Sequence, residues 1–223
     1  MSFSKTRLYV SCQASICSHL NNPELLLCVA KDVVSAGAFG IRAEGISNLK
    51  LMHENLKVPI ISLVKSKYQD GSVCITRKIS QINKLVEVGC KTIAVDGTNR
   101  IIDSMTGSMF ITFIKNNFPE VSIIADVSTL EEAVSSLYAG ANYVATTLRG
   151  YTPWTSHNSY DNFDFNFLDK ICSEISPNKI VAEGRISSPS IFGDLCAYNL
   201  NSIVVGKAIS DPKYLTKNFL GYD

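Results

Sequence analysis

A lysine closes one of the most apolar stretches of the chain. Residues 60–64 read IISLV, and Lys65 follows them directly. A continuous apolar run of this length is typical of a strand buried on both faces of a parallel sheet, which offers an ammonium group no solvated side. Lys65 therefore either reaches the surface where its strand ends or points into a cleft, where its nitrogen can act as a base or a nucleophile.

Polar side chains also close most of the other apolar runs. In chain order these residues are Gln13, Arg42, Lys65, Asp96, Asp126, Thr146 with Thr147, and Glu183, and the last run ends at Gly206. If the ends of the runs meet at one rim, two cations and three carboxylates can neutralise one another around a polar ligand. This arrangement favours a functional role for Lys65 over simple exposure at the surface.

Some of these residues have an equally good structural interpretation. Asp96 begins the segment DGTNR, where an aspartate often forms a turn. Arg42 can pair with Glu44 on the rim. Asp126 is freer, because the following segment STLEE supplies its own helix capping box.

The apolar runs alternate with segments of helical spacing. The predicted strands are 8–12, 39–42, 60–64, 92–96, 122–126, 143–147, 179–183 and 202–206. Predicted helices include 25–36, 79–88, 105–118, 130–138, 163–175 and 191–200. Gly37, Gly89 and Gly140 fall where helices should end, the position that favours a left-handed glycine cap.

This alternation predicts an α/β protein with eight strand–helix units. At about 28 residues per unit, the pattern fits a closed (β/α)8 barrel of roughly 250 residues or slightly fewer. An open doubly wound sheet is the alternative, but it rarely carries eight such regular units. No linker is visible, so we expect one domain over residues 1–223, with a long loop at 149–162. Active sites of such barrels lie at the carboxyl ends of the strands, where Lys65 is expected.

The loops after the last two predicted strands indicate a phosphate-binding site. Gly184 and Gly206 directly follow these strands, and each glycine precedes the start of a helix. In this fold these two loops frequently bind phosphate through backbone N–H groups. Gly184, Arg185, Gly206 and Lys207 are therefore candidate phosphate-binding residues.

Composition excludes several classes of protein. The formal net charge is +1, so the charge does not indicate binding to nucleic acid or to a membrane surface. No stretch approaches the roughly 18 apolar residues of a membrane span, and the first residues lack the apolar core of a signal peptide. The seven cysteines are scattered and form no CxxC pair, which indicates a reducing, cytoplasmic location. Since no histidine closes a predicted strand, we expect no metal site.

Several short motifs, in order, resemble the N-acetylmannosamine-6-phosphate 2-epimerases of bacterial sialic-acid catabolism over essentially the whole chain. They are VSCQA (10–14), GIRAEG (40–45), VPII (58–61) with Lys65 and Tyr68, VDGTNR (95–100), ADVSTLEE (125–132), TTLRGYT (146–152), VAEGRI (181–186) and VVGKAI (204–209). The resemblance implies a TIM barrel of the ribulose-phosphate-binding type that interconverts N-acetylmannosamine 6-phosphate and N-acetylglucosamine 6-phosphate. It also implies a homodimer that needs no redox or metal cofactor.

The resemblance implies roles for individual residues. Lys65 matches the catalytic lysine and Glu183 the catalytic glutamate. Contacts to the sugar match Gln13, Arg42 and Asp126, and we add Thr147 and Tyr151 of the TTLRGYT motif as candidate substrate contacts.

Inversion at C2 explains why these residue types are needed. A base must remove a weakly acidic proton next to C1, and a lysine can do so only when neutral, although its ordinary pKa is about 10.4. Desolvation and the neighbouring Arg42 would lower the pKa of Lys65, whereas Glu183 would raise it. Glu183 either orients Lys65 or handles the proton of a sugar hydroxyl, and one base or two can serve the two faces.

The chain departs from the family pattern after the last strand. The segment reads GKAISDP where the family has Gly-Gly-Ala-Ile-Thr-Arg-Pro, so Lys207 and Asp211 replace a glycine and an arginine. Arg149 stands where a serine is usual, and the segment NRIIDSMTG lacks the usual Arg-Pro-Asp-Gly. We expect Lys207 or Arg149 to replace a lost phosphate contact.

Two other functions fit the same barrel. One is an aldolase or lyase that uses Lys65 as a Schiff-base nucleophile, which borohydride would trap together with the substrate. The other is a sugar-phosphate-binding protein without catalysis, for which the altered last loop is the motivating feature. In each case the partner is a small sugar phosphate.

Overall fold

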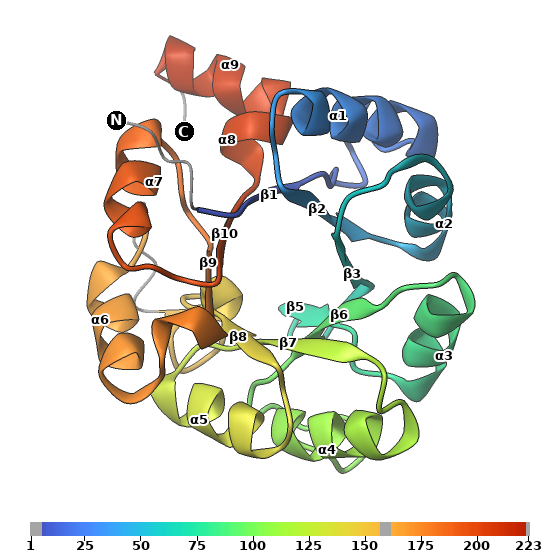
Figure 1. Cartoon of the computed structure of the whole chain (residues 1–223), viewed down its shortest axis with the longest axis vertical. Coiled ribbons are helices and arrows are strands. Elements are labelled where there is room, and N and C mark those ends of the chain that lie inside the picture. The colour runs from blue at the N-terminus through green and yellow to red at the C-terminus, as the bar shows by residue number, and fades with distance from the viewer. Residues whose placement is uncertain (1–5, 157–161, 222–223) are drawn as a thin grey trace.

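The computed structural model describes residues 6–156 and 162–221, so part of the predicted loop 149–162 lies outside the described residues. Eight parallel strands close into a barrel in the order β1-β10-β9-β8-β7-β6-β3-β2, and helices surround it (Figure 1). The strands are β1 (Leu8–Ser11), β2 (Gly40–Glu44), β3 (Ile60–Leu63), β6 (Thr92–Asp96), β7 (Ser122–Asp126), β8 (Tyr143–Ala145), β9 (Ile180–Glu183) and β10 (Ser202–Val205). The predicted (β/α)8 barrel is therefore confirmed. The open doubly wound sheet is wrong, because β1 pairs with both β2 and β10.

Helices follow the strands around the ring. They are α1 (Pro23–Ser35), α2 (Ile46–Asn55), α3 (Ile79–Glu87), α4 (Gly107–Asn117), α5 (Leu130–Tyr138), α6 (Phe165–Glu174), α7 (Pro189–Cys196), α8 (Lys207–Ser210) and α9 (Pro212–Leu220), with short 3-10 turns η1 (Thr146–Leu148) and η3 (Pro177–Lys179). Gly37, Gly89 and Gly140 follow α1, α3 and α5 with φ of 106°, 85° and 104°, which confirms the predicted left-handed caps.

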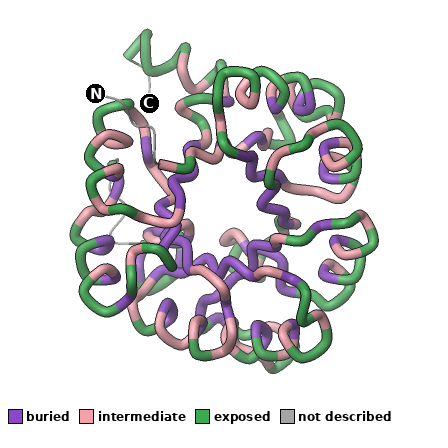
Figure 2. Tube along the Cα trace, in the orientation of Figure 1, coloured by how far each residue is buried: buried purple, intermediate pink, exposed green. Residues whose placement is uncertain are grey.

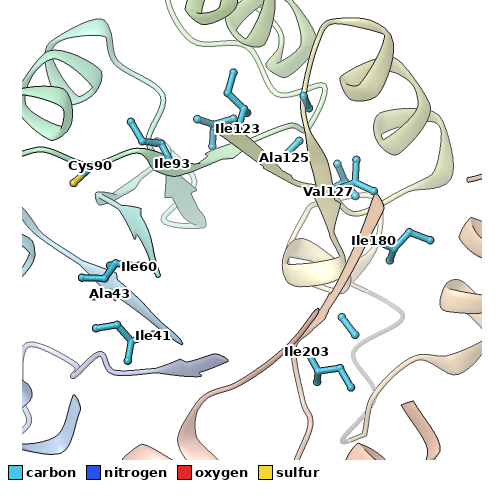
Figure 3. Packing of buried hydrophobic residues seen from close by; sticks show 14 of the residues in the cluster. Ile41, Ala43, Ile60, Cys90, Ile93, Ile123, Ala125, Val127, Ile180 and Ile203 are labelled. Atoms are coloured by element: carbon cyan, nitrogen blue, oxygen red, sulfur yellow. The ribbon is translucent and has the colours of Figure 1, made fainter. Parts of the chain in front are cut away.

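The alternation of side chains along each strand separates two apolar layers. Outward-facing residues such as Ile41, Ile93 and Ile123 pack with the helices in the main core (Figure 3). Inward-facing residues such as Ile124 and Val181 fill the barrel itself. The strands are consequently mostly buried, while the outer faces of the helices are exposed (Figure 2).

The inward alternation continues to the polar residues at the strand ends. Asp96 lies two residues beyond the inward Ala94, and Asp126 lies two residues beyond the inward Ile124. Because successive side chains of a strand point to opposite faces, the carboxylates at these ends must point into the mouth of the barrel. Arg42 lies between two outward residues of β2 and points inward for the same reason.

A small hairpin separates β3 from α3 and corrects the prediction for residues 60–64. The strand β3 ends at Leu63, and Lys65 begins a second strand rather than closing the first. That strand, β4 (Lys65–Lys67), pairs antiparallel with β5 (Val73–Ile75). The turn between them contains the pair Asp70-Gly71, with φ of 82° at the glycine. Lys65 therefore stands on its own hairpin, and β5 lies beside β6 (Figure 1).

The last helix, α9, extends from α8 at the edge of the ring (Figure 1), and no residue of it is buried. Phe219 and Leu220, near its end, are 92% and 61% exposed. Within the described residues, no helix is long and apolar enough to cross a membrane.

Candidate active site

Arg42 lies at the centre of a buried group of charges in the mouth of the barrel. Its Nη2 lies 2.7 Å from Oδ2 of Asp126, and its Nη1 lies 3.2 Å from Oδ1 of the same carboxylate. The same Nη1 lies 2.8 Å from Oε2 of Glu183. We call Arg42, Asp126 and Glu183 the arginine clamp, to which β2, β7 and β9 each contribute one residue. Arg42 thus pairs with these two carboxylates rather than with Glu44.

The hydroxyl of Thr147 joins the two carboxylates of the clamp. Its Oγ1 lies 2.8 Å from Oδ1 of Asp126 and 3.0 Å from Oε2 of Glu183. A hydroxyl group has one proton to donate, so Thr147 either divides that proton between the two carboxylates or donates to one and accepts from the other when that group is protonated. The turn η1, directly after β8, places this hydroxyl where it can share a proton with the clamp.

Glu183 is the carboxyl group that takes this proton most readily. One guanidinium faces two carboxylates, so the clamp carries an excess negative charge when both are ionised. Burial outweighs the attraction of Arg42 and, together with the Asp126 carboxylate, raises the pKa of Glu183 to about 7. Burial alone would lower the pKa of Arg42, but the two carboxylates reverse that effect and hold the guanidinium charged.

Lys65 reaches the same mouth from the hairpin. Its side chain keeps solvent access through the mouth, yet the surrounding protein desolvates the amine and lowers its pKa. Glu44 opposes this effect and Arg42 adds to it, while Glu183 and Asp126 also favour the ammonium. Glu44 approaches the backbone of Lys65 as well, since its Oε2 accepts a long hydrogen bond of 3.4 Å from that N–H group. The pKa values of Lys65 and Glu183 are thus shifted towards each other.

The clamp and the hairpin enclose a cavity of about 140 Å³. It is lined by Ser11, Gln13, Arg42, Lys65, Val73, Ile75, Thr147, Leu148, Tyr151 and Glu183. Six of the predicted site residues therefore meet here, and Asp126 lies directly behind Arg42. A larger hollow of about 420 Å³ lies between α1 and α2, but it is open to solvent and none of the predicted site residues lines it.

Two polar atoms at this cavity have hydrogen-bonding capacity left for a ligand. Within residues 6–156 and 162–221, the buried Oε1 of Gln13 and Nε of Arg42 have no hydrogen-bond partner. Buried polar atoms are rarely left unsatisfied, since each costs about 1–3 kcal/mol. An acceptor and a donor are therefore left unsatisfied on two residues that line the cavity.

The four candidate phosphate-binding residues lie beside the cavity rather than in its lining. Gly184 and Arg185 follow β9 with φ of 106° and 55°, and the Arg185 guanidinium stacks 4.5 Å from the ring centre of Tyr151. Its Nη1 also donates to the carbonyl of Arg149 at 2.8 Å. Gly206 and Lys207 follow the adjacent strand β10, where Lys207 is exposed.

The departures from the family pattern have local structural roles. Arg149 binds Asp164 at 2.9 Å through Nε, and its guanidinium lies 4.6 Å from the ring centre of Phe167. These contacts hold Arg149 at the start of α6, and its role as a replacement phosphate contact stays a prediction. Asp211 caps α9 by accepting a hydrogen bond from the N–H of Tyr214 at 3.1 Å.

The hairpin contributes a part of the cavity lining that was not predicted from the sequence. Val73 and Ile75 form an apolar wall opposite the clamp, and they belong to a strand that was not predicted. The sequence does contain an indication of this hairpin, because the pair Asp70-Gly71 between short runs of strand-forming residues is a typical hairpin turn. Among the described residues, no group of three histidine, cysteine, aspartate or glutamate side chains is placed to hold a metal ion.

Comparison with known proteins gives a consistent result. The family model described as "Putative N-acetylmannosamine-6-phosphate epimerase" matches residues 26–222. A protein from Staphylococcus saprophyticus described as "Putative N-acetylmannosamine-6-phosphate 2-epimerase" is 36% identical over 96% of both chains. A protein from Staphylococcus carnosus with the same description is 34% identical over 96% of this chain and 95% of its own.

Solved structures extend the comparison to the fold. The N-acetylmannosamine-6-phosphate 2-epimerase from Clostridium perfringens superposes with a TM-score of 0.87 at 30% identity, covering 98% of this chain and 95% of the other. The thiamine phosphate pyrophosphorylase from Pyrococcus furiosus has a TM-score of 0.61 at 16% identity, covering 96% of this chain and 92% of its own. This second likeness concerns the barrel alone.

Proposed function

Because the chain belongs to the N-acetylmannosamine-6-phosphate 2-epimerase family, it interconverts N-acetylmannosamine 6-phosphate and N-acetylglucosamine 6-phosphate, and we propose that Lys65 and Glu183 carry the proton transfers. The observation that supports these roles is one shared cavity in which the pKa of the lysine is lowered and that of the glutamate is raised. Both groups can then exchange protons near neutral pH. The reaction belongs to the breakdown of sialic acids and other amino sugars.

Lys65 is the base at C2. The C2 proton is acidic only when C1 is an aldehyde, so the ring-opened sugar is the form that reacts. The neutral amine takes the proton, and the electron pair moves into an enolate whose negative charge rests on the C1 oxygen. Return of a proton to the opposite face, from the Lys65 ammonium if one base serves both faces or from a second acid if two do, restores the aldehyde with C2 inverted.

Glu183 handles the hydroxyl proton of ring opening. Ring opening removes a proton from the C1 hydroxyl and places one on the ring oxygen. A carboxyl group with a pKa of about 7 suits both steps, since it is a weak acid and a weak base at the same pH. Thr147 can pass the proton within the clamp, because its hydroxyl touches both carboxylates.

The remaining cavity residues hold the sugar. Gln13 and Arg42 offer the unsatisfied acceptor and donor, which suit the acetamido group and the oxygen that becomes negative. Asp126 keeps the Arg42 guanidinium in place. Tyr151, which lines the cavity and is 46% exposed, gives a flat face for the sugar.

The phosphate binds in the loops after β9 and β10. These strands are neighbours in the barrel, so Gly184 and Gly206 bring two backbone turns together. Arg185 and Lys207 add positive charge beside them. Binding energy from a phosphate that does not react can position C2 against the base.

The function is tested by incubating the protein with N-acetylmannosamine 6-phosphate in D2O and following the C2 proton by NMR. We expect deuterium at C2 together with N-acetylglucosamine 6-phosphate, and no adduct at Lys65 after borohydride treatment. With unphosphorylated N-acetylmannosamine at equal concentration, we expect exchange to slow by about tenfold or more because the remote binding energy is lost. Folded protein that exchanges no C2 proton would exclude the epimerase reaction, and a borohydride adduct would indicate an aldolase.

We also propose that the protein is a homodimer in which α9 packs on the partner. The exposed side chains of Phe219 and Leu220 support this arrangement, since large apolar groups at one helix end rarely remain in water together. In sedimentation, the protein should therefore have twice the chain mass. A Phe219→Asp, Leu220→Asp variant should be monomeric, whereas Tyr138→Asp, which changes another exposed side chain, should remain dimeric. A wild-type protein of single chain mass would exclude the dimer.

We place the protein in the cytoplasm. All seven cysteines lie among the described residues and are unpaired, which suits a reducing compartment. Fractionation of the source cells, followed by detection of the chain in each fraction, tests this location.

A further inference from the structure

The hairpin that carries Lys65 has two different faces. Lys65, Val73 and Ile75 line the cavity, and Lys65 is directly opposite Ile75 in the antiparallel pair. Ser66 and the buried Cys74, which are also opposite each other, occupy the alternate positions and point away from the cavity. Tyr68 continues this second face one residue beyond β4.

The second face of the hairpin rests on a buried ion pair at the end of β6. The hydroxyl of Tyr68 donates to Oδ2 of Asp96 at 3.2 Å. The same Oδ2 lies 2.7 Å from Nη2 of Arg100, whose guanidinium stacks 4.0 Å from the ring centre of Tyr68. Nη1 of Arg100 also donates to the hydroxyl of Ser72, in the hairpin turn, at 3.0 Å. We call Tyr68, Asp96 and Arg100 the hairpin anchor.

The two oxygens of Asp96 have separate partners. Oδ1 accepts hydrogen bonds from the N–H and the hydroxyl of Thr98, at 3.1 and 2.6 Å, which is the turn-forming role that the sequence allowed. Oδ2 is used for the hairpin anchor instead. A turn alone needs only the first oxygen, so the second set of contacts requires its own explanation.

The anchor also relates the hairpin to the clamp. Asp96 is directly opposite Asp126 in the pairing of β6 with β7, and Asp126 holds Arg42. Arg77, which follows β5, donates to the backbone carbonyl of Asp96 at 3.3 Å. The hairpin is therefore fixed to the same point of the barrel wall at its tip and at its end.

We propose that the hairpin anchor positions Lys65 against C2, with Tyr68 as the positioning residue that transmits the fixed location of Asp96 to the base. This inference rests on the proposed role of Lys65. Tyr68 does not line the cavity, since it lies on the opposite face of the hairpin. A base that is loosely held loses rate steeply, because a displacement of about 1 Å can cost about 100-fold.

Tyr68→Phe is the sharpest test, because it removes only the hydroxyl that reaches Asp96. Tyr198→Phe is the matched control, since the Tyr198 hydroxyl also donates to a carboxylate, that of Asp169 at 2.7 Å, on the outer surface. We expect Tyr68→Phe to lower kcat by about tenfold with KM within about twofold, since positioning of the base rather than binding is lost. Tyr198→Phe should leave both values unchanged.

A second readout does not depend on turnover. Trace acetic anhydride acetylates only neutral amines, so the yield at Lys65 against pH, measured by mass spectrometry of its peptide, reports its ionisation. The charged groups that act on Lys65 are Glu44, Arg42, Glu183 and Asp126, all of which stay in place in Tyr68→Phe. We expect the Lys65 profile to move to higher pH in this variant, because a loosened hairpin admits water to the amine.

The outcomes separate the inference from the proposed function. A Tyr68→Phe protein with the kcat and the acetylation profile of the wild type would overturn the inference and leave the epimerase reaction intact. Absence of C2 exchange in the wild type would refute the proposed roles, while the acetylation profile would still decide whether Tyr68 positions Lys65.

Discussion

Lys65→Ala should lower the rate of epimerisation by about 10³- to 10⁴-fold, and C2 exchange in D2O should fall equally. The reason is that Lys65 is, among the described residues, the only amine that lines the cavity, and the hairpin holds it there as the proposed base for C2. Binding of the sugar phosphate should persist, because the proposed contacts to the sugar and the phosphate come from other residues. The measurement is steady-state kinetics together with the NMR exchange rate.

Two matched variants show whether the loss of activity comes from lost proton transfer or from a lost positive charge on the hairpin. Lys65→Arg keeps a positive charge at the same place, but a guanidinium cannot become neutral in this range, so the variant should be as inactive as Lys65→Ala. Lys67→Ala removes an exposed lysine two residues along the same strand and should keep full activity. A Lys65→Arg protein that retains substantial activity would contradict the role of Lys65 as a base.

Arg42→Met should produce the largest loss of stability among the site residues. Removal of the guanidinium leaves Asp126 and Glu183 buried without a positive partner, and breaking a buried pair in this way costs about 3–5 kcal/mol. Urea unfolding at pH 8, compared with the wild type, measures this loss. The variant should also be inactive.

The loss of stability in Arg42→Met should be larger at high pH than at low pH, because Glu183 loses its proton as the pH rises. The folded-state pKa of Glu183 is raised from 4.5 to about 7, so its proton stabilises the fold fully below the unfolded value and no longer does so once the pH passes 7. Near pH 5 Glu183 is protonated, and Arg42→Met then leaves only one buried charge, so the penalty should be smaller than at pH 8. Adding Glu183→Gln should recover part of the stability at pH 8 and little at pH 5. Equal losses at both pH values would contradict the shared proton of the clamp.

Much of the site follows from the period of the strands. Once the eight apolar runs are placed in a closed barrel, inward alternation and the common direction of the strands bring Arg42, Asp126 and Glu183 to one mouth. Their mutual contacts, however, depend on side-chain reach across three strands. The sequence therefore allowed Arg42 to pair with Glu44 as readily as with the clamp.

The hairpin is a feature that the period of the strands did not predict. The run IISLV continues into Lys65 without a break, so periodicity alone predicted one strand with lysine at its end. The strand ends at Leu63 because the chain turns away from the barrel, and residues 65–67 then pair with residues 73–75. In the sequence, only the turn residues between these two strands indicate this pairing. The ion pair of Arg149 was not predicted for a related reason, since its partner Asp164 lies beyond a loop whose path the sequence does not give.

The arginine clamp also constrains how this protein can change over evolutionary time. One guanidinium serves two carboxylates from two other strands, so loss of Arg42 leaves two buried carboxylates without a positive partner, whereas loss of one carboxylate leaves a balanced pair. Single-step neutral drift at Arg42 is therefore blocked. Descendants that abandon the reaction should lose a carboxylate before they lose the arginine.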